Sequence, residues 1–199
     1  MQVNNIHQHR SAIPYIILTG IIAALCSLKC SSNKIQPRRI TASSQLAPTA
    51  SYSYGPEMLN DDKPSTAWAE GAKGDGIGES LLIEFGAARD IASMEIINGF
   101  AEMHKSLGDL YFANNRVRSL RLEFDDGTED VSLRDGSKEL QVITFNRSHN
   151  STRVKATISG VYRGAKFNDT CISELRFLEP KQSQQRQGIT APERSGSGT

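Results

Sequence analysis

Four polar and glycine-rich segments carry the side chains of this sequence that could bind a ligand. Asparagine amides donate and accept hydrogen bonds and so suit hydroxyl groups, whereas arginine and lysine can pair with a carboxylate or another anion. Asparagine is also common in turns, so a structural role competes with a binding role at each of its positions. The candidate ligand-binding residues are Trp68, Glu70, Lys73, Asp75, Asn98, Asn114, Arg116, Lys166, Asn168 and Asp169.

Two of these segments allow a second interpretation. Trp68 is the only tryptophan of the sequence and could stack on a ring of a ligand, but packing in the core is the favoured role. Residues 71–79 contain a Gly-x-Gly-x-Gly pattern that lacks the lysine and the following helix of a phosphate-binding loop. A loop whose backbone closely approaches a sugar or another strand is therefore favoured there.

The sequence shows no recognisable catalytic set. His104 and His149 are the only histidines after the first nine residues, and neither lies in a nucleophile motif. Cys171 alternates in phase with apolar residues of a predicted strand, which favours a small buried core residue over a nucleophile. A carboxylate pair such as Glu70 and Asp75 would suit glycoside hydrolysis, and that alternative stays open. We predict that the protein is not an enzyme.

The composition argues against several other classes of partner. The 199 residues include 23 Lys and Arg against 22 Asp and Glu, and a net charge of +1 supplies no field for non-specific binding of nucleic acid. Four histidines and three cysteines give no cluster with zinc spacing. The acidic residues at 125–130 could suit calcium, but an Asp-Asp-Gly turn flanked by acids is more often a solvated hairpin tip. We therefore expect no metal, no cofactor and no nucleic-acid partner.

The start of the sequence has the pattern of an export signal. An uncharged apolar run at residues 12–25 is too short for a comfortable membrane span but fits a secretory signal peptide. Cys26 and Cys30, with the Ser-Ser-Asn that follows, resemble the lipidation site of a bacterial lipoprotein. Leu25 and Lys29 stand where such a site has a small residue, so lipidation, an uncleaved membrane anchor and plain secretion all stay open.

The central region has the periodicity of half-buried strands. Leu81, Ile83 and Phe85 alternate with polar residues, and period two is the signature of a strand with one face in the core. Further predicted strands lie at residues 94–96, 120–124, 131–133, 140–145, 154–158 and 171–177. Turn residues such as Asp-Asp-Gly at 125–127 separate them, and about eight short strands without a convincing amphipathic helix predict an all-β antiparallel sandwich of jelly-roll type.

These patterns divide the chain into four parts. The segments on both sides of the strands are rich in Ser, Gln, Pro and Arg, and such segments bury too little apolar surface to offset the entropy of ordering. The predicted parts are a signal peptide or membrane anchor at 1–30, a polar tether at 31–50, a β-sandwich at 51–179 and a disordered tail at 180–199.

A family resemblance rests on several motifs in order. Residues 60–68, Asn-Asp-Asp-Lys-Pro-Ser-Thr-Ala-Trp, resemble the Asp-Gly-x-Pro-Ser-Thr-Ala-Trp signature of discoidin-like domains, also called F5/8 type C or galactose-binding-like domains. With the motifs at 70–79, 97–99, 114–116 and 166–174, residues 50–178 are similar to the glycan-binding translocation domain of NAD-glycohydrolase toxins. Asp62, where the family has glycine or another turn residue, and an idiosyncratic loop at 101–112 depart from the pattern.

The resemblance implies a galactose-binding-like sandwich whose loops gather at one end. It also implies a non-catalytic module that binds a glycan or a host-surface ligand through those loops. The alternative is a structural or adhesion lipoprotein that binds a protein partner through the same face. With the N-terminal signal, either function indicates the bacterial cell envelope, where the protein is membrane-anchored, secreted or periplasmic.

The N-terminal pattern predicts that the protein fractionates with membranes. Mass spectrometry of the mature N-terminus checks this, and acylated Cys26 or Cys30 is the expected result. A mature protein without acyl groups in the soluble fraction would exclude lipidation and leave secretion.

Overall fold

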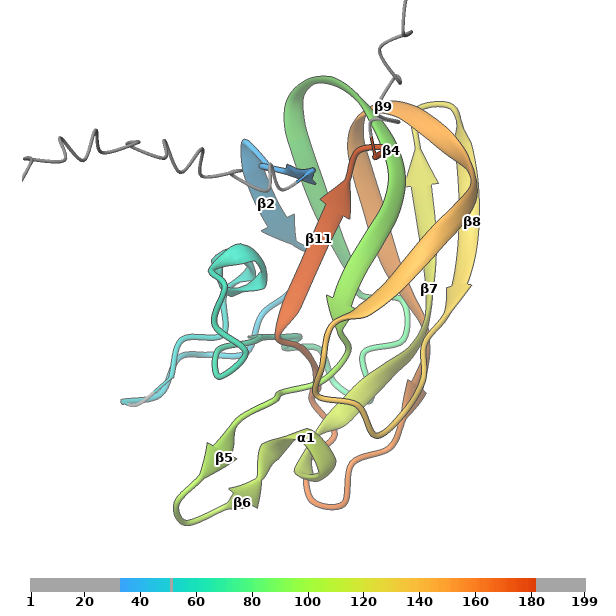
Figure 1. Cartoon of the computed structure of the whole chain (residues 1–199). Helices are drawn as coiled ribbons and strands as arrows, with labels where there is room; N and C mark the ends of the chain where they lie inside the picture. Colours follow the sequence, from blue (N-terminus) through green and yellow to red (C-terminus); the bar gives the residue numbers. More distant parts are fainter. Residues whose placement is uncertain (1–32, 51, 182–199) are drawn as a thin grey trace, which may run out of the picture. The chain divides into compact units, whose positions relative to one another are not determined.

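The structure is a computed structural model that describes residues 33–50 and 52–181 (Figure 1). Cys26 and Cys30, the predicted lipidation residues, lie outside the described residues, as do the whole predicted signal segment at 1–30 and residues 182–199 of the predicted tail. Within the described ranges, no helix is long and apolar enough to cross a membrane.

The described residues form eleven strands, one short α-helix and one 3-10 helix. In chain order these are β1 (Lys34–Ile35), β2 (Arg39–Ala42), η1 (Pro56–Asn60), β3 (Trp68–Ala69), β4 (Ser80–Ile97), β5 (Met103–His104), β6 (Gly108–Asp109), α1 (Leu110–Ala113), β7 (Asn115–Phe124), β8 (Gly127–Ser132), β9 (Gln141–Tyr162), β10 (Thr170–Ile172) and β11 (Glu174–Leu178). Nine strands form one curled sheet in the order β1-β11-β4-β9-β7-β10-β3, with β2 paired to β4 and β8 paired to β7. The predicted all-β sandwich is confirmed, and β5 and β6 form a separate hairpin.

Two long strands replace four of the predicted short ones. β4 has 18 residues and β9 has 22, and they pair antiparallel over most of their lengths. Their register shifts between Glu84 and Arg89, where Gly86 adopts a φ of +80°, a conformation that favours glycine. Because both strands bend there, their two halves lie in opposite layers of the sandwich (Figure 1).

The main core lies between the two layers. Leu81, Ile83 and Phe85 of β4 point inward, as their alternation predicts, and Phe85 meets Phe177 of β11 edge to face at 6.0 Å between centroids. Full burial of each such side chain stabilises the fold by about 1.5–3 kcal/mol. A second, smaller apolar cluster lies apart from this core and consists of Ala67, Ala69, Phe100, Leu110, Ala113 and Cys171.

The structure corrects the prediction of a polar tether at residues 31–50. β1 pairs with β11 and buries Ile35 to 3% exposure, while β2 pairs with β4 over Leu81–Glu84. Ser44 accepts a hydrogen bond from the Trp68 indole on its carbonyl oxygen at 3.0 Å. Polar composition misled the prediction because strand pairing is made by backbone groups, which every non-proline residue carries.

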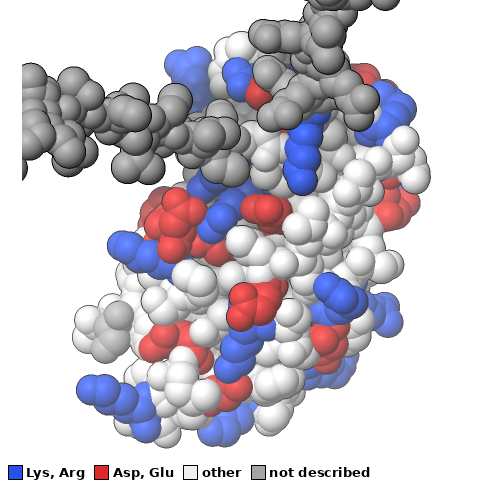
Figure 2. Space-filling model, in the orientation of Figure 1, with Lys and Arg blue, Asp and Glu red and all other residues white. Residues whose placement is uncertain are grey.

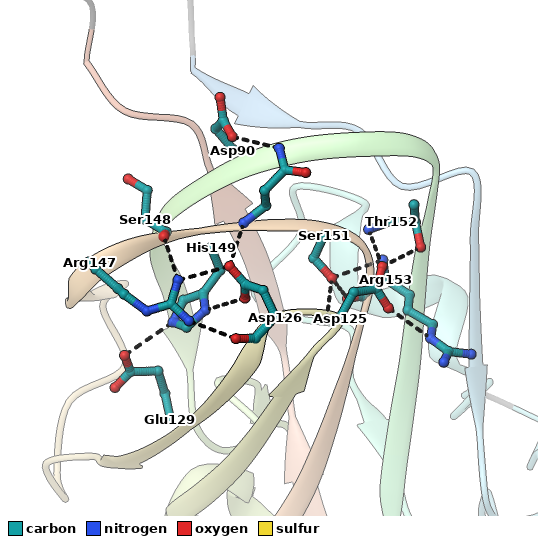
Figure 3. A network of polar contacts seen from close by, with 11 residues as sticks. Asp90, Asp125, Asp126, Glu129, Arg147, Ser148, His149, Ser151, Thr152 and Arg153 are labelled. Carbon is teal, nitrogen blue, oxygen red and sulfur yellow. Dashed lines mark hydrogen bonds and ion pairs between the residues drawn. The ribbon is translucent and has the colours of Figure 1, made fainter.

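A polar network holds the end of the sandwich where β4 and β9 bend (Figure 3). His149 is 1% exposed, and its Nδ1 and Nε2 lie 2.7 and 3.1 Å from carboxylate oxygens of Asp126 and Glu129. Both ring nitrogens thus face carboxylates, and the ring stacks on Phe124 at 4.0 Å between centroids. Hydrogen bonds from Arg147 in particular lower the pKa of Asp126.

The acidic residues weighed as calcium ligands therefore have protein partners. Asp125 accepts hydrogen bonds from the backbone and hydroxyl of Thr152 at 2.8 and 2.6 Å, and Asp130 pairs with Arg121. No group of three His, Cys, Asp or Glu suited to a metal ion occurs among the described residues. Charged side chains of both signs are interspersed over the face shown in Figure 2.

We expect residues 33–50 to contribute to the stability of the sandwich. A chain of residues 51–181 should unfold with a free energy about 3 kcal/mol lower than a chain of residues 33–181, because Ile35 and the β2 edge lose their packing. Urea denaturation followed by circular dichroism measures both. Equal stability of the two chains would show that the pairing of β1 and β2 contributes nothing.

Candidate functional site

Three loop segments meet at the end of the sandwich that carries β5, β6 and α1 (Figure 1). Residues 43–50, 52–54, 98–114 and 163–169 form this loop end, which contains a cavity of about 330 Å³. We call this cavity the aromatic pocket. It is lined by Leu46, Thr49, Tyr52, Tyr54, Ala69, Phe100, His104, Leu107, Leu110, Asn114, Phe167, Asp169 and Cys171.

Aromatic side chains from all three segments form much of the lining. Tyr52 and Tyr54 stack with centroids 6.1 Å apart, and Phe100 meets both rings edge to face at 5.6 and 6.5 Å. His104 lies 5.9 Å from Tyr52, and Phe167 contributes a further ring to the lining. Because burial raises the pKa of both tyrosines, their phenol groups stay neutral hydrogen-bond donors.

Polar side chains complete the lining, among them those of His104, Asn114 and Asp169. His104 Nδ1 accepts hydrogen bonds from the backbone amides of Ser106 and Leu107 at 3.1 and 3.0 Å, so the proton of the ring sits on Nε2. Asn114 donates from Nδ2 to a carbonyl oxygen of α1 at 2.8 Å, which leaves its own side-chain oxygen as an acceptor. Asp169 adds a carboxylate. The pocket therefore offers apolar ring surface with a few hydrogen-bonding groups.

Hydrogen bonds fix the loop at 163–169 against α1 and the β5–β6 hairpin. Asn115 donates from Nδ2 to the carbonyl oxygen of Asn168 at 2.6 Å and accepts from the amide of Gly164 at the same distance. Lys166 donates from Nζ to the carbonyl oxygen of Leu107 at 3.1 Å. A Cβ at Gly164 would lie 2.5 Å from a carbonyl oxygen of α1, so only glycine allows this approach. The walls of the pocket are thus positioned before any ligand binds.

The structure places Arg116 inside the protein and not at a binding surface. Its guanidinium donates from Nε and Nη2 to the two carboxylate oxygens of Asp135 at 3.0 and 2.8 Å. Nη1 donates to the carbonyl oxygens of Asn114 and Arg163 at 3.1 and 2.9 Å. The side chain is 6% exposed, and these bonds to Arg116 lower the pKa of Asp135.

Asn98 belongs to the same buried polar group. Its Oδ1 accepts from the Tyr111 hydroxyl at 2.8 Å and from Gln141 at 3.1 Å, and its Nδ2 donates to the carbonyl oxygens of Val117 and Arg134. The residue has no exposed surface. All of its hydrogen-bonding capacity is used inside the protein, which corrects its prediction as a ligand-binding residue.

Trp68 and Glu70 are also buried and cannot touch a ligand. Both have no exposed surface, and Glu70 accepts hydrogen bonds from the amides of Ala72 and Thr170 at 2.7 and 3.2 Å. Burial raises the pKa of Glu70. Asp75, the other member of the proposed hydrolytic pair, forms an ion pair with Arg163 at 3.3 Å. Glu70 is thus enclosed and Asp75 is ion-paired, an arrangement that gives the hydrolytic alternative no support.

The remaining predicted residues are divided between the surface and the pocket. Lys73, Lys166 and Asn168 are exposed but do not line the aromatic pocket, whereas Asn114 and Asp169 do. The prediction of one shared polar patch is therefore wrong for most of its members. Buried hydrogen-bonding groups must be satisfied internally, and at this end of the sandwich the amides and the arginine do that.

Sequence reasoning missed the aromatic lining. Tyr54 and Phe167 lie within the four polar and glycine-rich segments, but the prediction of ligand contacts includes no tyrosine or phenylalanine of those segments. Tyr52, Phe100 and His104 flank the same segments. The available signal was that these rings fall in loops, outside the alternation of the strands, where an aromatic side chain has no core position to fill.

A comparison with protein families gives one match. The model of the family described as "NAD glycohydrolase translocation F5/8 type C domain" matches residues 31–178. That family is a translocation domain and not a catalytic one. Among curated proteins, none matches this chain.

Solved structures show the same fold. The CBM32 domain of AlyQ in complex with 4,5-unsaturated mannuronic acid has a TM-score of 0.50 and 13% identity, and the match covers 74% of this chain and 98% of that one. The structure of two CBM32 domains of Clostridium perfringens ZmpB in complex with GalNAc has a TM-score of 0.56 and 15% identity. That match covers 74% of this chain and 35% of the other. A further C. perfringens CBM32 domain, in complex with GalNAc-β-1,3-galactose, has a TM-score of 0.51 and 18% identity. That match covers 73% of this chain and 95% of the other.

We expect Arg116 and Asn98 to act on stability. Arg116→Gln removes the guanidinium that pairs with Asp135 and should lower the free energy of unfolding by about 2–3 kcal/mol. Asn98→Ala removes the hydrogen-bond partner of Tyr111 and should lower it by a similar amount. Urea denaturation measures both, and the exposed Lys73→Gln serves as a control that stays within about 0.5 kcal/mol. Unchanged stability combined with lost ligand affinity would return both residues to a binding role.

Proposed function

The chain belongs to the NAD glycohydrolase translocation F5/8 type C domain family, and on that premise we propose that it is a non-catalytic carbohydrate-binding module that holds a glycan in the aromatic pocket. The observation that carries the proposal is the assembly of aromatic rings from three loops around hydrogen-bonding groups. Sugars present an apolar ring face and a rim of hydroxyl groups, and the pocket offers a complement to each.

The size and the position of the pocket support this proposal. Its volume of about 330 Å³ is at the small end of the range for ligand sites, which suits a single terminal sugar better than a long chain. The pocket opens at the loop end, and loops on a rigid sandwich are common carriers of binding residues. The matched CBM32 structures include complexes with GalNAc and with GalNAc-β-1,3-galactose, so hexoses of this kind are suitable first probes.

The chemistry of the lining supports binding over catalysis. Burial raises the pKa of Cys171, so its thiol stays protonated and unreactive at neutral pH. The described lining residues include a single carboxylate, Asp169, where glycoside hydrolysis ordinarily uses two. We therefore propose that the protein acts without chemical turnover.

We propose further that this module works at the bacterial cell envelope, exported and held there by its N-terminal segment. This part of the proposal rests on the apolar run and on the cysteines at 26 and 30. Asn33 and Glu179 are hydrogen-bonded to each other, and Glu179 pairs with Arg89 at the bend of β4. Both ends of the described chain thus lie at the end of the sandwich opposite to α1 and the β5–β6 hairpin (Figure 1).

An adhesion module for a protein partner is the second candidate function. Met103, Leu107 and Phe112 are exposed apolar side chains on and beside the β5–β6 hairpin, at 62%, 41% and 47%. Apolar side chains gathered at one surface can mark a protein contact. This candidate places the partner on the hairpin, outside most of the pocket.

Two aromatic substitutions distinguish these functions. Tyr52→Ala removes a ring of the pocket and should weaken glycan binding by about 2 kcal/mol, roughly thirty-fold, with the fold retained. Phe112→Ala removes an exposed ring that does not line the pocket and should leave glycan affinity unchanged. A glycan array followed by isothermal titration measures both. Glycan binding that survives Tyr52→Ala but is lost in Phe112→Ala would move the site to the hairpin.

A further inference from the structure

We propose that the carboxylate of Asp169 gives the aromatic pocket a charge preference, so that it binds sugars carrying an ammonium group in preference to neutral sugars and disfavours uronic acids. This inference rests on the proposed glycan-binding function and names the class of sugar for the same site. It concerns a residue that lines the pocket and has no counterion among the residues that the structure describes.

The Asp169 side chain has no partner in the described part of the chain. No described residue forms an ion pair with its carboxylate or donates a hydrogen bond to it. The backbone of Asp169 is fixed, because its carbonyl oxygen accepts from the amide of Asn115 at 3.1 Å. A carboxylate on a fixed backbone, without an internal partner and at the wall of a cavity, is available to a ligand.

The other groups of the lining do not neutralise this charge. Burial keeps the phenols of Tyr52 and Tyr54 and the thiol of Cys171 uncharged. His104 accepts two backbone hydrogen bonds on Nδ1, so this nitrogen does not donate to the carboxylate. Apolar walls reduce solvent screening, so one carboxylate has more effect here than on an open surface.

Four basic side chains at this end of the sandwich are held by other protein groups. Lys166 is exposed and donates to the carbonyl oxygen of Leu107, and Arg116 is paired with Asp135. Arg163 pairs with Asp75, and Lys138 pairs with Asp109. None of these four basic residues lines the pocket, so a uronate would meet Asp169 without a compensating cation.

The aromatic rings add a second reason for the same preference. The face of a phenol or benzene ring carries a partial negative charge, and an ammonium over such a face is attracted to it. Tyr52, Tyr54 and Phe100 form one contiguous group of rings in the same cavity as Asp169. An ammonium on a bound hexose would therefore meet ring faces and a carboxylate together.

Three sugars that differ mainly in charge test the proposal on the full chain. Methyl glycosides of galactosamine, galactose and galacturonic acid are titrated by isothermal calorimetry slightly below neutral pH, where the amine is protonated, with the glucose series in parallel. We expect galactosamine to bind roughly ten-fold tighter than galactose and galacturonic acid to bind more weakly than both. Added salt should reduce the differences in affinity among the three sugars.

Two matched variants locate the effect. Asp169→Asn keeps the shape of the side chain and removes its charge, so the three affinities should converge while that of galactose stays close to the wild type. Lys73→Gln removes an exposed ammonium that does not line the pocket and should leave the order of the three affinities unchanged. If the order of the three affinities persists in Asp169→Asn, or reverses in Lys73→Gln, this inference is overturned while glycan binding stands. If none of the sugars binds to the wild type, the proposed function itself fails.

Discussion

The antiparallel pairing of β4 with β9 is the constraint on which the rest of this structure depends. The two strands pair through both layers and change layer together at the bend next to Gly86. β2 and β11 attach to β4, and β7 attaches to β9, so most of the sheet is ordered by this one pair. The network around His149 holds the β7–β8 turn against the bend and satisfies its charged groups there.

Buried polar side chains hold the backbone in place at the loop end, opposite to the bend of β4 and β9. The irregular backbone of the loop end leaves carbonyl oxygens and amides without strand partners, and these groups need internal partners when they are buried. Arg116, Asn98 and Asn115 supply them, each with several hydrogen bonds to loop carbonyls or side chains. The residues that most resemble ligand contacts in the sequence are thus the ones that hold the loops of this end in place.

Function on this fold depends on what the loops present. The fold matches CBM32 domains at identities too low to transfer a ligand, so the proposed glycan rests on the pocket of this chain. Its rings come from three segments, and the carboxylate of Asp169 comes from the last of them. Substitutions in these loops would alter the ligand without disturbing the pairing of the long strands.

The sequence by itself determined the all-β class, the inward phase of strands such as Leu81–Phe85 and the buried position of Cys171, because alternation is a local property of the chain. Its motifs also indicated the family. Only the tertiary structure decided that residues 33–50 belong to the fold, since their pairing uses backbone groups that side-chain composition does not reveal. Tertiary structure also buried Arg116 and Asn98 and brought the rings of Tyr52, Phe100 and Phe167 together. The burial of a side chain and the meeting of rings from different segments depend on contacts between residues far apart in the chain. A local sequence pattern therefore does not predict them.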